Sequence, residues 1–260
     1  MMKKRSLKKE IRPTRIDQLL VLAGHVQSRE RAKALIKAGH VLIDGKPIFK
    51  VATKCALGAK IEVTAKDIPW VSRAALKLEG TLDRWPINIT NATCLDIGAS
   101  TGGFTEVLLR RGARQVYALD VGHGQLAQRL RGNPRVIVME GRNIRAATNT
   151  WFPESIDIIT VDVSFISLKH VLPKVAELLR NDGEAIVLIK PQFEIGRAQA
   201  RIRKGVVRDP DLHKQVIDTI KILAAKEGLV PQGIIESSIK GVGGNKEFLL
   251  YLKKLIQKSD

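Results

Sequence analysis

The stretch that decides the fold is Leu95–Phe104, which reads LDIGASTGGF. Its first residues suit a buried strand, and small residues follow where a helix then begins. Small residues let a ligand approach the backbone closely, and the first amides of a helix are free to bind an anionic group. The stretch therefore predicts a strand, a ligand-binding turn and a helix.

Apolar runs rich in β-branched residues surround this turn from about residue 92 to the end of the chain. Helical patterns separate most of them, and the clearest are Ser72–Asp83, Leu168–Arg180 and Leu212–Lys226. The strand-like runs are Thr93–Ile97, Gln115–Leu119, Arg135–Met139, Ile156–Val161, Glu184–Ile189, Gly233–Glu236 and Phe248–Leu252. This alternation predicts an α/β domain with a Rossmann-like, seven-stranded, mostly parallel sheet covered by helices on both faces.

A smaller α+β domain is predicted before it. Ile16–Ala23 and Arg29–Ala38 have helical spacing, with Ser28 as the N-cap of the second helix, whose apolar face holds Ala32, Leu35 and Ile36. Val41–Ile48 predicts a hairpin with a tight Asp44–Gly45 turn, and Lys60–Val63 a last strand. The predicted plan is a basic extension (1–13), this small domain (14–63), a linker (64–71) and the larger domain (72–260).

The net charge is +18, and it is unevenly distributed. The first 73 residues hold 17 Lys and Arg against 6 Asp and Glu, which is an excess of 11. Such an excess predicts a polyanionic partner, with nucleic acid ahead of a membrane, although a solvated helix face is the alternative. The cations predicted to bind RNA are Arg15, Arg29, Arg31, Lys33, Lys37 and Arg73, of which Arg29, Lys33 and Lys37 form one helical stripe.

Several functions are disfavoured by composition. Cys55 and Cys94 lack the spacing of a disulfide scaffold or a metal site, so buried thiols in a reducing compartment and no metal are predicted. The segment Met1–Glu10 lacks the apolar run of a signal peptide, and no window is long and apolar enough to span a membrane. These features predict a cytoplasmic protein.

The glycine-rich turn predicts a particular kind of cofactor. Its spacing is not G-x-G-x-x-G, so a dinucleotide fits poorly, whereas the carboxylate of an adenosyl amino acid could meet the helix amides. Asp120 ends the second strand 22 residues after Gly98, where an acid can accept hydrogen bonds from ribose hydroxyls. A structural turn in another α/β fold is the alternative. The predicted cofactor residues are Asp96, Gly98, Ala99, Ser100, Thr101, Gly102, Gly103, Phe104, Asp120, Val121, Asn143 and Asp162.

Four charged residues are predicted to form the catalytic site, namely Lys77, Asp162, Lys190 and Glu247. Asp162 ends the fourth strand and Lys190 ends the fifth, just before Pro191. Adjacent strand ends at the carboxyl edge of such a sheet form the ligand crevice. Each of these residues alone could be an ordinary charged side chain in solvent. The four together indicate a catalytic site only because the glycine-rich turn is predicted to lie beside them.

The larger domain and the small one both resemble known families. Ser72–Leu78, Leu95–Phe104, Asp120–Gly122, Val161–Ser167, Lys190–Glu194 and Gly244–Glu247 resemble the TlyA family, whose members are named haemolysins and are known as ribosomal RNA 2′-O-methyltransferases. The same domain is similar to the FtsJ-like group, whose Lys-Asp-Lys-Glu tetrad falls on Lys77, Asp162, Lys190 and Glu247. Arg15–Leu20 and Ser28–Ala32 resemble the RNA-binding module named after small-subunit ribosomal protein four.

The resemblance implies S-adenosylmethionine as cofactor and a ribose 2′-hydroxyl as acceptor, in a cytidine of small- or large-subunit ribosomal RNA. The partner would be that RNA or a ribosomal subunit. Lys190 would be the general base, oriented by Asp162 and favoured in its neutral form by Lys77, while Glu247 orients Lys77 or the substrate. The chain departs from the family pattern beside the cofactor edge, with His123 in place of an aromatic residue and Gln128 in place of Trp.

Three other functions compete with this one. A non-enzymatic RNA-binding assembly factor would not need the complete tetrad. A secreted cytolysin would need a signal peptide or a strongly apolar amphipathic segment. A methyltransferase acting on a base or a small molecule could share the fold, but Asp162–Phe165 lacks the prolines typical of base N-methylation sites.

Overall fold

The computed structural model describes residues 14–26, 29–37, 39–55, 58–64, 69–196 and 205–256. The chain divides into two compact units, Met1–Pro69 and Trp70–Asp260. The predicted basic extension (1–13), the predicted N-cap Ser28 and residues 65–68 of the predicted linker lie outside the described residues.

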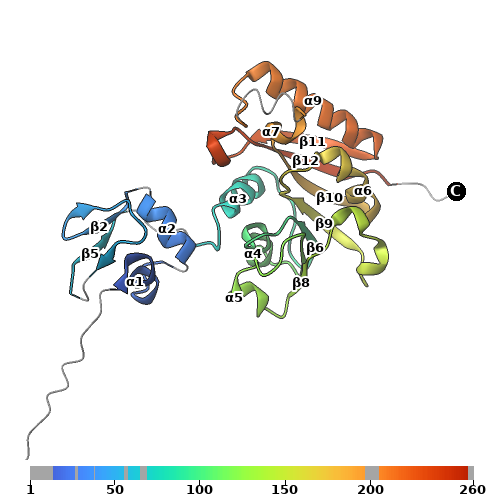
Figure 1. Ribbon diagram of the computed structural model, residues 1–260. Helices are drawn as coiled ribbons and strands as arrows, with labels where there is room; N and C mark the ends of the chain where they lie inside the picture. Colours follow the sequence, from blue (N-terminus) through green and yellow to red (C-terminus); the bar gives the residue numbers. More distant parts are fainter. Residues whose placement is uncertain are drawn as a thin grey trace, which may run out of the picture. The chain divides into compact units, whose positions relative to one another are not determined.

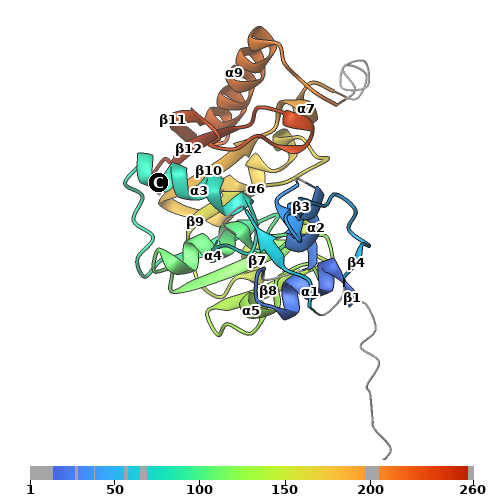
Figure 2. The same cartoon turned by 90° about the vertical axis from the view of Figure 1, so that its left-hand side faces the viewer.

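The larger unit is built around one seven-stranded sheet (Figure 1). Its strands in spatial order are β11 (Leu229–Glu236), β12 (Phe248–Lys254), β10 (Leu179–Ile189), β9 (Ile156–Val161), β6 (Thr93–Ile97), β7 (Gln115–Asp120) and β8 (Val136–Glu140). Figure 2 shows this order from β11 near the top towards β8 near the bottom. Only β12 pairs in antiparallel fashion with its neighbours, while the other pairs are parallel. The predicted fold is thereby confirmed.

Helices cover both faces of this sheet. α3 (Ala74–Arg84) packs against α4 (Gly103–Arg110) on one face, and α6 (Leu172–Leu178) lies on the other (Figure 1). α9 (Pro210–Lys226) packs against α6 and β11. Among the described residues of this unit, the remaining turns of helix are α5 (Gln128–Arg131), α7 (Pro191–Glu194) and the 3₁₀ turns Ile144–Ala146, Asn149–Trp151, Leu168–His170 and Val242–Gly244. Because both faces are covered, all five residues of β6 are buried.

The predicted helix Leu168–Arg180 is wrong in its limits. A 3₁₀ turn precedes α6, since Pro173 fits only the first turn of an α-helix. α6 ends at Leu178, and Leu179 already pairs with Ile156 in the sheet. β11 also begins earlier than predicted and contains Pro231, which is tolerated because β11 lies at the edge of the sheet.

The smaller unit packs two helices, α1 (Ile16–Leu22) and α2 (Arg29–Lys37), against short strands. Ala32, Leu35 and Ile36 are buried, which confirms the predicted apolar face of α2. Asp44 and Gly45 have φ values of 48° and 76°, as the predicted tight hairpin turn requires. The strands are β2 (Val41–Ile43), β3 (Lys46–Pro47), β5 (Ile61–Val63) and an unpredicted pair, β1 (Thr14–Arg15) with β4 (Lys54–Cys55).

The described residues also bear on the cysteines, on membrane spans and on metal sites. Cys55 and Cys94 are both buried, as predicted. Across the described ranges, no helix is long and apolar enough to cross a membrane, and no group of three or more His, Cys, Asp or Glu side chains could hold a metal ion.

Candidate active site

The carboxyl edge of the sheet brings the four predicted catalytic residues together. Asp162 follows β9, Lys190 follows β10, Glu247 precedes β12, and Lys77 lies on α3. Lys77 Nζ lies 2.6 Å from Glu247 Oε2 and 3.8 Å from Asp162 Oδ2. Lys190 Nζ lies 2.5 Å from Asp162 Oδ1. Negative and positive groups therefore alternate from Glu247 through Lys77 and Asp162 to Lys190.

These four side chains are largely removed from water. The exposed fraction is 3% for Glu247, 10% for each lysine and 14% for Asp162. An unpaired charge in such a place is strongly unfavourable, and the alternation of signs gives each charge a partner. Ser164, which the sequence analysis did not single out, accepts a hydrogen bond from Lys190 Nζ at 2.9 Å. Lys190 is thus held by two neighbouring groups.

A cavity of about 210 Å³ lies at the glycine-rich turn. Asp162, Ser164 and Lys190 form one wall of it. The other lining residues are Ser72, Ala74, Gly98, Ala99, Ser100, Thr101, Gly103 and Phe104. Most of the predicted cofactor residues are therefore brought together. Ser72 and Ala74 were not predicted, although they belong to the string Ser72–Leu78 that resembles the family.

Glycines allow the chain to close around this cavity. Gly98 has a φ of 85°, and an added Cβ would lie 2.4 Å from the backbone oxygen of Asp162. A Cβ on Gly103 would lie 2.4 Å from Ser72 Oγ. Gly102 caps the start of α4 with a φ of 96° and packs against Leu130. It is not among the residues that line the cavity. The exposed backbone and the first amides of α4 suit the amino acid part of S-adenosylmethionine, so the residues present fit this cofactor.

Asp120 ends β7, as predicted, but it is not among the residues that line this cavity, and its contact with a ribose stays a prediction. Its Oδ2 accepts the Ser100 N–H at 2.8 Å, and its Oδ1 accepts the Gly122 N–H at 2.7 Å. Each oxygen retains a lone pair for a ribose hydroxyl. Val121 is 66% exposed beside it. Asn143 is exposed and accepts the Arg145 N–H at 3.0 Å as a cap of the Ile144–Ala146 turn.

Asp96 is not at the cavity, so its predicted contact with the cofactor is unsupported. Its side chain is fully buried, and its two carboxylate oxygens accept hydrogen bonds from Thr105 Oγ1 at 2.6 Å and Thr160 Oγ1 at 2.9 Å. Burial raises the pKa of this carboxyl to about 6. Asp96 therefore ties β6 to α4 and β9 beneath the turn.

The loop after β7 carries the departure from the family pattern. The His123 ring lies against Gly141, where an added Cβ would be 2.2 Å from His123 Cε1. Gln128 begins α5. Glu140 accepts the N–H groups of Leu126, Gly124 and Gln125 and pairs with Arg131, and these bonds, led by that from Leu126, lower its pKa to about 2. Glu140 therefore anchors the loop without an aromatic residue at position 123.

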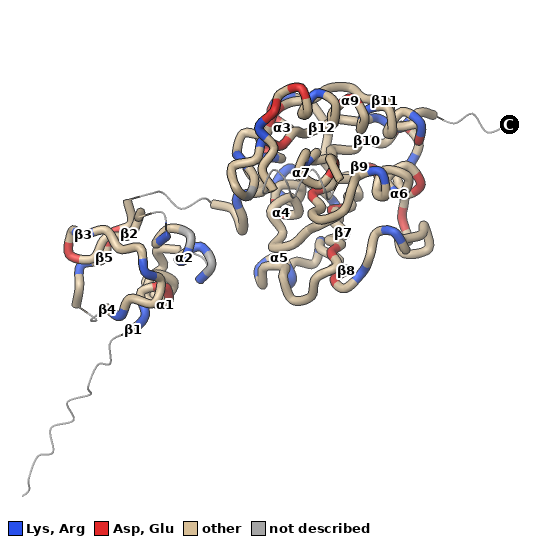
Figure 3. Tube along the Cα trace, turned by 45° about the horizontal axis from the view of Figure 1, so that its top comes forward, with Lys and Arg blue, Asp and Glu red and all other residues tan. Residues whose placement is uncertain are grey.

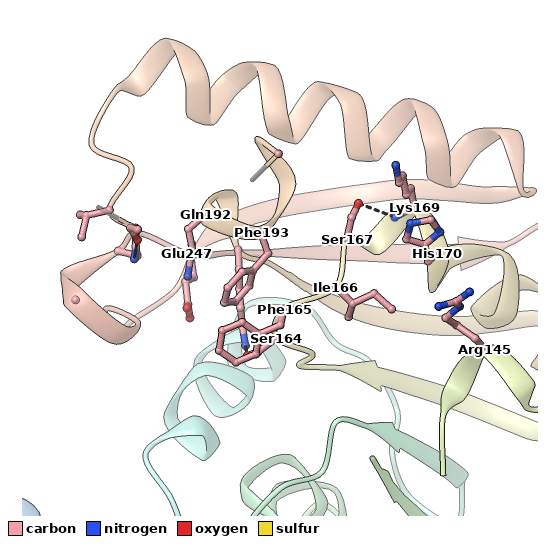
Figure 4. A pocket seen from close by; sticks show the side chains of 16 residues that line it. Arg145, Ser164, Phe165, Ile166, Ser167, Lys169, His170, Gln192, Phe193 and Glu247 are labelled. Atoms are coloured by element: carbon pink, nitrogen blue, oxygen red, sulfur yellow. Dashed lines mark hydrogen bonds between the residues drawn. The ribbon is translucent and has the colours of Figure 1, made fainter. Parts of the chain in front are cut away.

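A second cavity, of about 1000 Å³, borders the tetrad at Lys190 and Glu247. Lys190 and Ser164 line it as well as the smaller cavity. Figure 4 shows two ends: Gln192, Glu247, Phe193, Phe165 and Ser164 lie at one, and Lys169, His170 and Arg145 at the other. Phe165 is 90% exposed, has a φ of 64° and contacts Phe193, with ring centroids 5.0 Å apart.

In the smaller unit, the structure gives two of the predicted RNA-binding residues a shared partner. Asp17 is fully buried, and its carboxylate accepts from Arg15 at 2.9 Å and from Arg29 at 2.9 Å. The bonds from Arg15 lower the pKa of Asp17 to about 2. Both arginines remain about half exposed. Arg31 and Lys33 are half-buried, and Lys37 on α2 and Arg73 in the larger unit are exposed. Figure 3 shows Lys and Arg on β1, α2 and β4.

The sheet order, the glycine-rich turn and the buried tetrad define a Rossmann-like methyltransferase domain. Family comparison matches residues 70–254 to the FtsJ-like methyltransferase family and residues 14–61 to the S4 domain. The chain belongs to the FtsJ-like methyltransferase family. The predicted family and class of enzyme are thereby confirmed.

Individual relatives agree with this assignment. The 16S/23S rRNA (cytidine-2′-O)-methyltransferase TlyA of Mycobacterium tuberculosis is 44% identical over 243 residues, covering 93% of this chain and 90% of that protein. A solved structure described as a hemolysin from Streptococcus thermophilus has a TM-score of 0.75 and 39% identity, covering 95% of this chain and 90% of that one. The fold alone is shared with an S-adenosylmethionine dependent methyltransferase from Listeria monocytogenes, with a TM-score of 0.53, 16% identity and coverage of 70% and 98%.

Proposed function

We propose that this protein transfers a methyl group from S-adenosylmethionine to the ribose 2′-hydroxyl of a cytidine in ribosomal RNA. The observation that carries the proposal is that Lys190 and Ser164 line both cavities. A group that can accept a proton therefore stands between a place for the cofactor and a place for the acceptor. The name of the mycobacterial relative, a 16S/23S rRNA (cytidine-2′-O)-methyltransferase, supports the choice of acceptor.

The cofactor is held in this proposal by the smaller cavity. The backbone of Gly98–Thr101 and the start of α4 would hold its amino acid part, and Asp120 at the end of β7 would hold its ribose hydroxyls. When bound, S-adenosylmethionine supplies an electrophilic methyl group. Because Asp162 also lines this cavity, the residue that orients Lys190 borders the cofactor directly.

Lys190 is the general base. In its neutral form, Nζ would accept the proton of the 2′-hydroxyl as the oxygen–carbon bond forms and the bond between the methyl group and sulfur breaks. The products would be the 2′-O-methyl ribose, S-adenosylhomocysteine and a lysine ammonium. Asp162 and Ser164 keep Nζ in place, since both lie within hydrogen-bond distance of it. Lys77 is a positioning residue that shares Asp162, and Glu247 holds Lys77 through the 2.6 Å contact. Much of the rate then comes from the orientation of the hydroxyl.

The larger cavity receives the acceptor nucleotide. A 2′-hydroxyl exists only in RNA, and unpaired RNA bases are commonly stacked on aromatic side chains. Phe165 offers an exposed ring close to Ser164, and Arg145 and Lys169 at the far end can meet phosphates. An unpaired nucleotide in this cavity would have both its ribose and its backbone accommodated.

The smaller unit holds the RNA. The S4 match, the charge excess of the first 73 residues and the exposed sides of Arg15, Arg29 and Lys37 support this role. Contacts to phosphates position an RNA without reading its sequence, so the choice of nucleotide is left to the larger unit. An enzyme with this substrate would work in the cytoplasm, where ribosomes are assembled.

Labelled methyl transfer tests the proposal. Purified protein is incubated with labelled S-adenosylmethionine and, separately, with small subunits, large subunits and tRNA, and the RNA is then digested and examined by mass spectrometry. We expect a 2′-O-methylated cytidine in one or both ribosomal RNAs. Cofactor binding without transfer to any RNA would instead favour an assembly factor.

A further inference from the structure

One end of the larger cavity, here called the cationic end, consists of Arg145, Lys169 and His170. Figure 4 shows these three side chains at the same end of the cavity. All three are exposed, and within the described part of the chain none of them forms an ion pair. Several arginines elsewhere in the larger unit, such as Arg111 and Arg114, are paired with carboxylates instead. The cationic end therefore keeps its positive charge available for an anion.

The acids nearby have other partners. Glu247 is the one carboxylate among the described lining residues, and it is 3% exposed and contacts Lys77 at 2.6 Å. Glu194, on α7, accepts the Ser167 hydroxyl at 2.6 Å and the Leu168 N–H at 2.9 Å. Neither carboxylate pairs with a cation of the cationic end. A cleft lined by one sign of charge concentrates ligands of the opposite sign, so this end of the cavity favours an anionic ligand.

Two 3₁₀ turns carry these cations, and both turns are firmly held. They are Ile144–Ala146, which follows β8, and Leu168–His170, which follows β9. The side chains of Asn143 and Ser167 cap them by accepting backbone N–H groups. The first residue of each turn is buried in the core of the larger unit. Because rigid supporting elements make a binding group effective, the backbone is in place before a ligand arrives.

The size of the cavity leaves room for more than a nucleoside. Its volume is about 1000 Å³, which is at the upper limit for pockets that bind small molecules. Ser164 and Phe165 lie at the end opposite to the cationic end (Figure 4), and the proposed function places the acceptor ribose beside Ser164. An RNA strand carries a negative phosphate at every nucleotide. A strand whose acceptor ribose lies beside Ser164 can therefore bring a phosphate to the cationic end.

We propose that Arg145, Lys169 and His170 bind a backbone phosphate of the acceptor RNA next to the methylated nucleotide; this inference rests on the proposed function. The planar Arg145 guanidinium donates two parallel hydrogen bonds to phosphate oxygens, and Lys169 adds a point charge. A ring N–H of His170 donates a further hydrogen bond. Phosphate contacts position an RNA. The larger unit thus holds the acceptor strand by contacts of its own, in addition to those of the smaller unit.

The double variant Arg145→Gln, Lys169→Gln tests the inference. Its binding to purified small- and large-subunit ribosomal RNA is measured by filter binding at increasing salt. We expect affinity to fall about tenfold and the negative slope of log affinity against log salt to become shallower by roughly 1 to 2, because fewer counterions are released. In the methylation assay, KM for the RNA should rise about tenfold while kcat stays within about twofold, since the tetrad is unchanged. Tm should not change, because both side chains are exposed.

Lys214→Gln with Lys226→Gln is the matched control. Both lysines are exposed on α9, and among the residues that the structure describes neither forms an ion pair or lines the cavity. The control should leave affinity, salt slope and KM close to those of the wild type. Equal changes in both double variants, or none in either, would overturn the inference and indicate a solvated surface. A lower kcat at unchanged KM would also overturn it, in favour of a role in the chemistry. If the wild type methylates no RNA but the first variant alone binds RNA less tightly, the proposed function fails and the phosphate contact stands.

Discussion

Two carboxylates in this chain each lie between two cations, and they differ in what is buried. Asp17 is fully buried, but its partners Arg15 and Arg29 are 41% and 50% exposed. Asp162 is 14% exposed, and its partners Lys77 and Lys190 are only 10% exposed. The first carboxylate presents cations to solvent, whereas the second holds them inside the protein.

The difference separates binding from chemistry. An arginine keeps its charge in any protein environment, so Arg15 and Arg29 remain cations that can meet phosphates. In the proposed function Lys190 acts as the base, because it lines both cavities. In the proposed function, the same arrangement of charges thus serves two purposes, RNA binding and catalysis, and the identity of the cation and the depth of burial separate them.

Of the substitutions considered, Lys190→Ala in the buried cluster should have the largest effect on turnover. Turnover should fall about 1000-fold or more, because the proton acceptor is lost. Affinity for S-adenosylmethionine, measured by calorimetry, should stay within about threefold, since backbone groups provide much of that site. Lys214→Ala on the exposed side of α9 is the control. Unchanged turnover would remove Lys190 from the mechanism.

Asp162→Asn should show how much the buried cluster depends on its shared anion. Lys77 and Lys190 would lose their common partner, so turnover should fall about 100-fold and the free energy of unfolding by about 1–3 kcal/mol. Asp17→Asn is the matched change in the other cluster. It should leave turnover at saturating RNA close to that of the wild type. Equal losses of turnover in both variants would contradict the separation of the two clusters.

Replacing Arg29, Lys33 and Lys37 together with Gln tests the exposed cluster. RNA affinity should fall about tenfold. The negative slope of log affinity against log salt should become shallower by roughly 2. A second triple variant, Lys214→Gln, Lys221→Gln and Lys226→Gln on α9, changes the net charge equally. Because Arg29 also pairs with Asp17, folding is checked by circular dichroism. The same salt slope in wild type and first variant would indicate a merely solvated helix face.

The smallest expected effect is the pH dependence of the Asp17 cluster. The pKa of Asp17 is lowered to about 2 in the folded protein, against an ordinary value near 4. Its stabilising contribution is therefore complete above about pH 4 and is lost as the pH falls towards 2. Asp17→Asn should be less stable than wild type by about 1–2 kcal/mol at pH 5, and the gap should narrow by pH 3. Urea unfolding followed by NMR signals of α1 and α2 measures this gap, and a constant gap would refute the assignment.

Local sequence determined much of the fold. Thr93–Ile97 and Ile156–Val161 are strands with the predicted limits, because each is a short apolar run bounded by turn residues. The helix limits near Leu178 and the two-residue strands were not predictable, because a helix and a buried strand share the same apolar composition over a few residues. Tertiary pairing with Ile156 decided that Leu179 belongs to the sheet.

The candidate site divides in the same way. Position at strand ends pointed to Asp162, Lys190 and most of the glycine-rich turn, since parallel strands place their carboxyl ends at one edge. The resemblance to the FtsJ-like group supported the complete tetrad, with Lys77 on its helix and Glu247 before the last strand. Only the tertiary structure decided that Asp96 is buried beneath the turn, that Asp17 joins Arg15 and Arg29, and that Ser164 and Gln192 line the larger cavity. Hydrogen-bond partners and burial depend on contacts between distant segments, and no local pattern in the sequence records them.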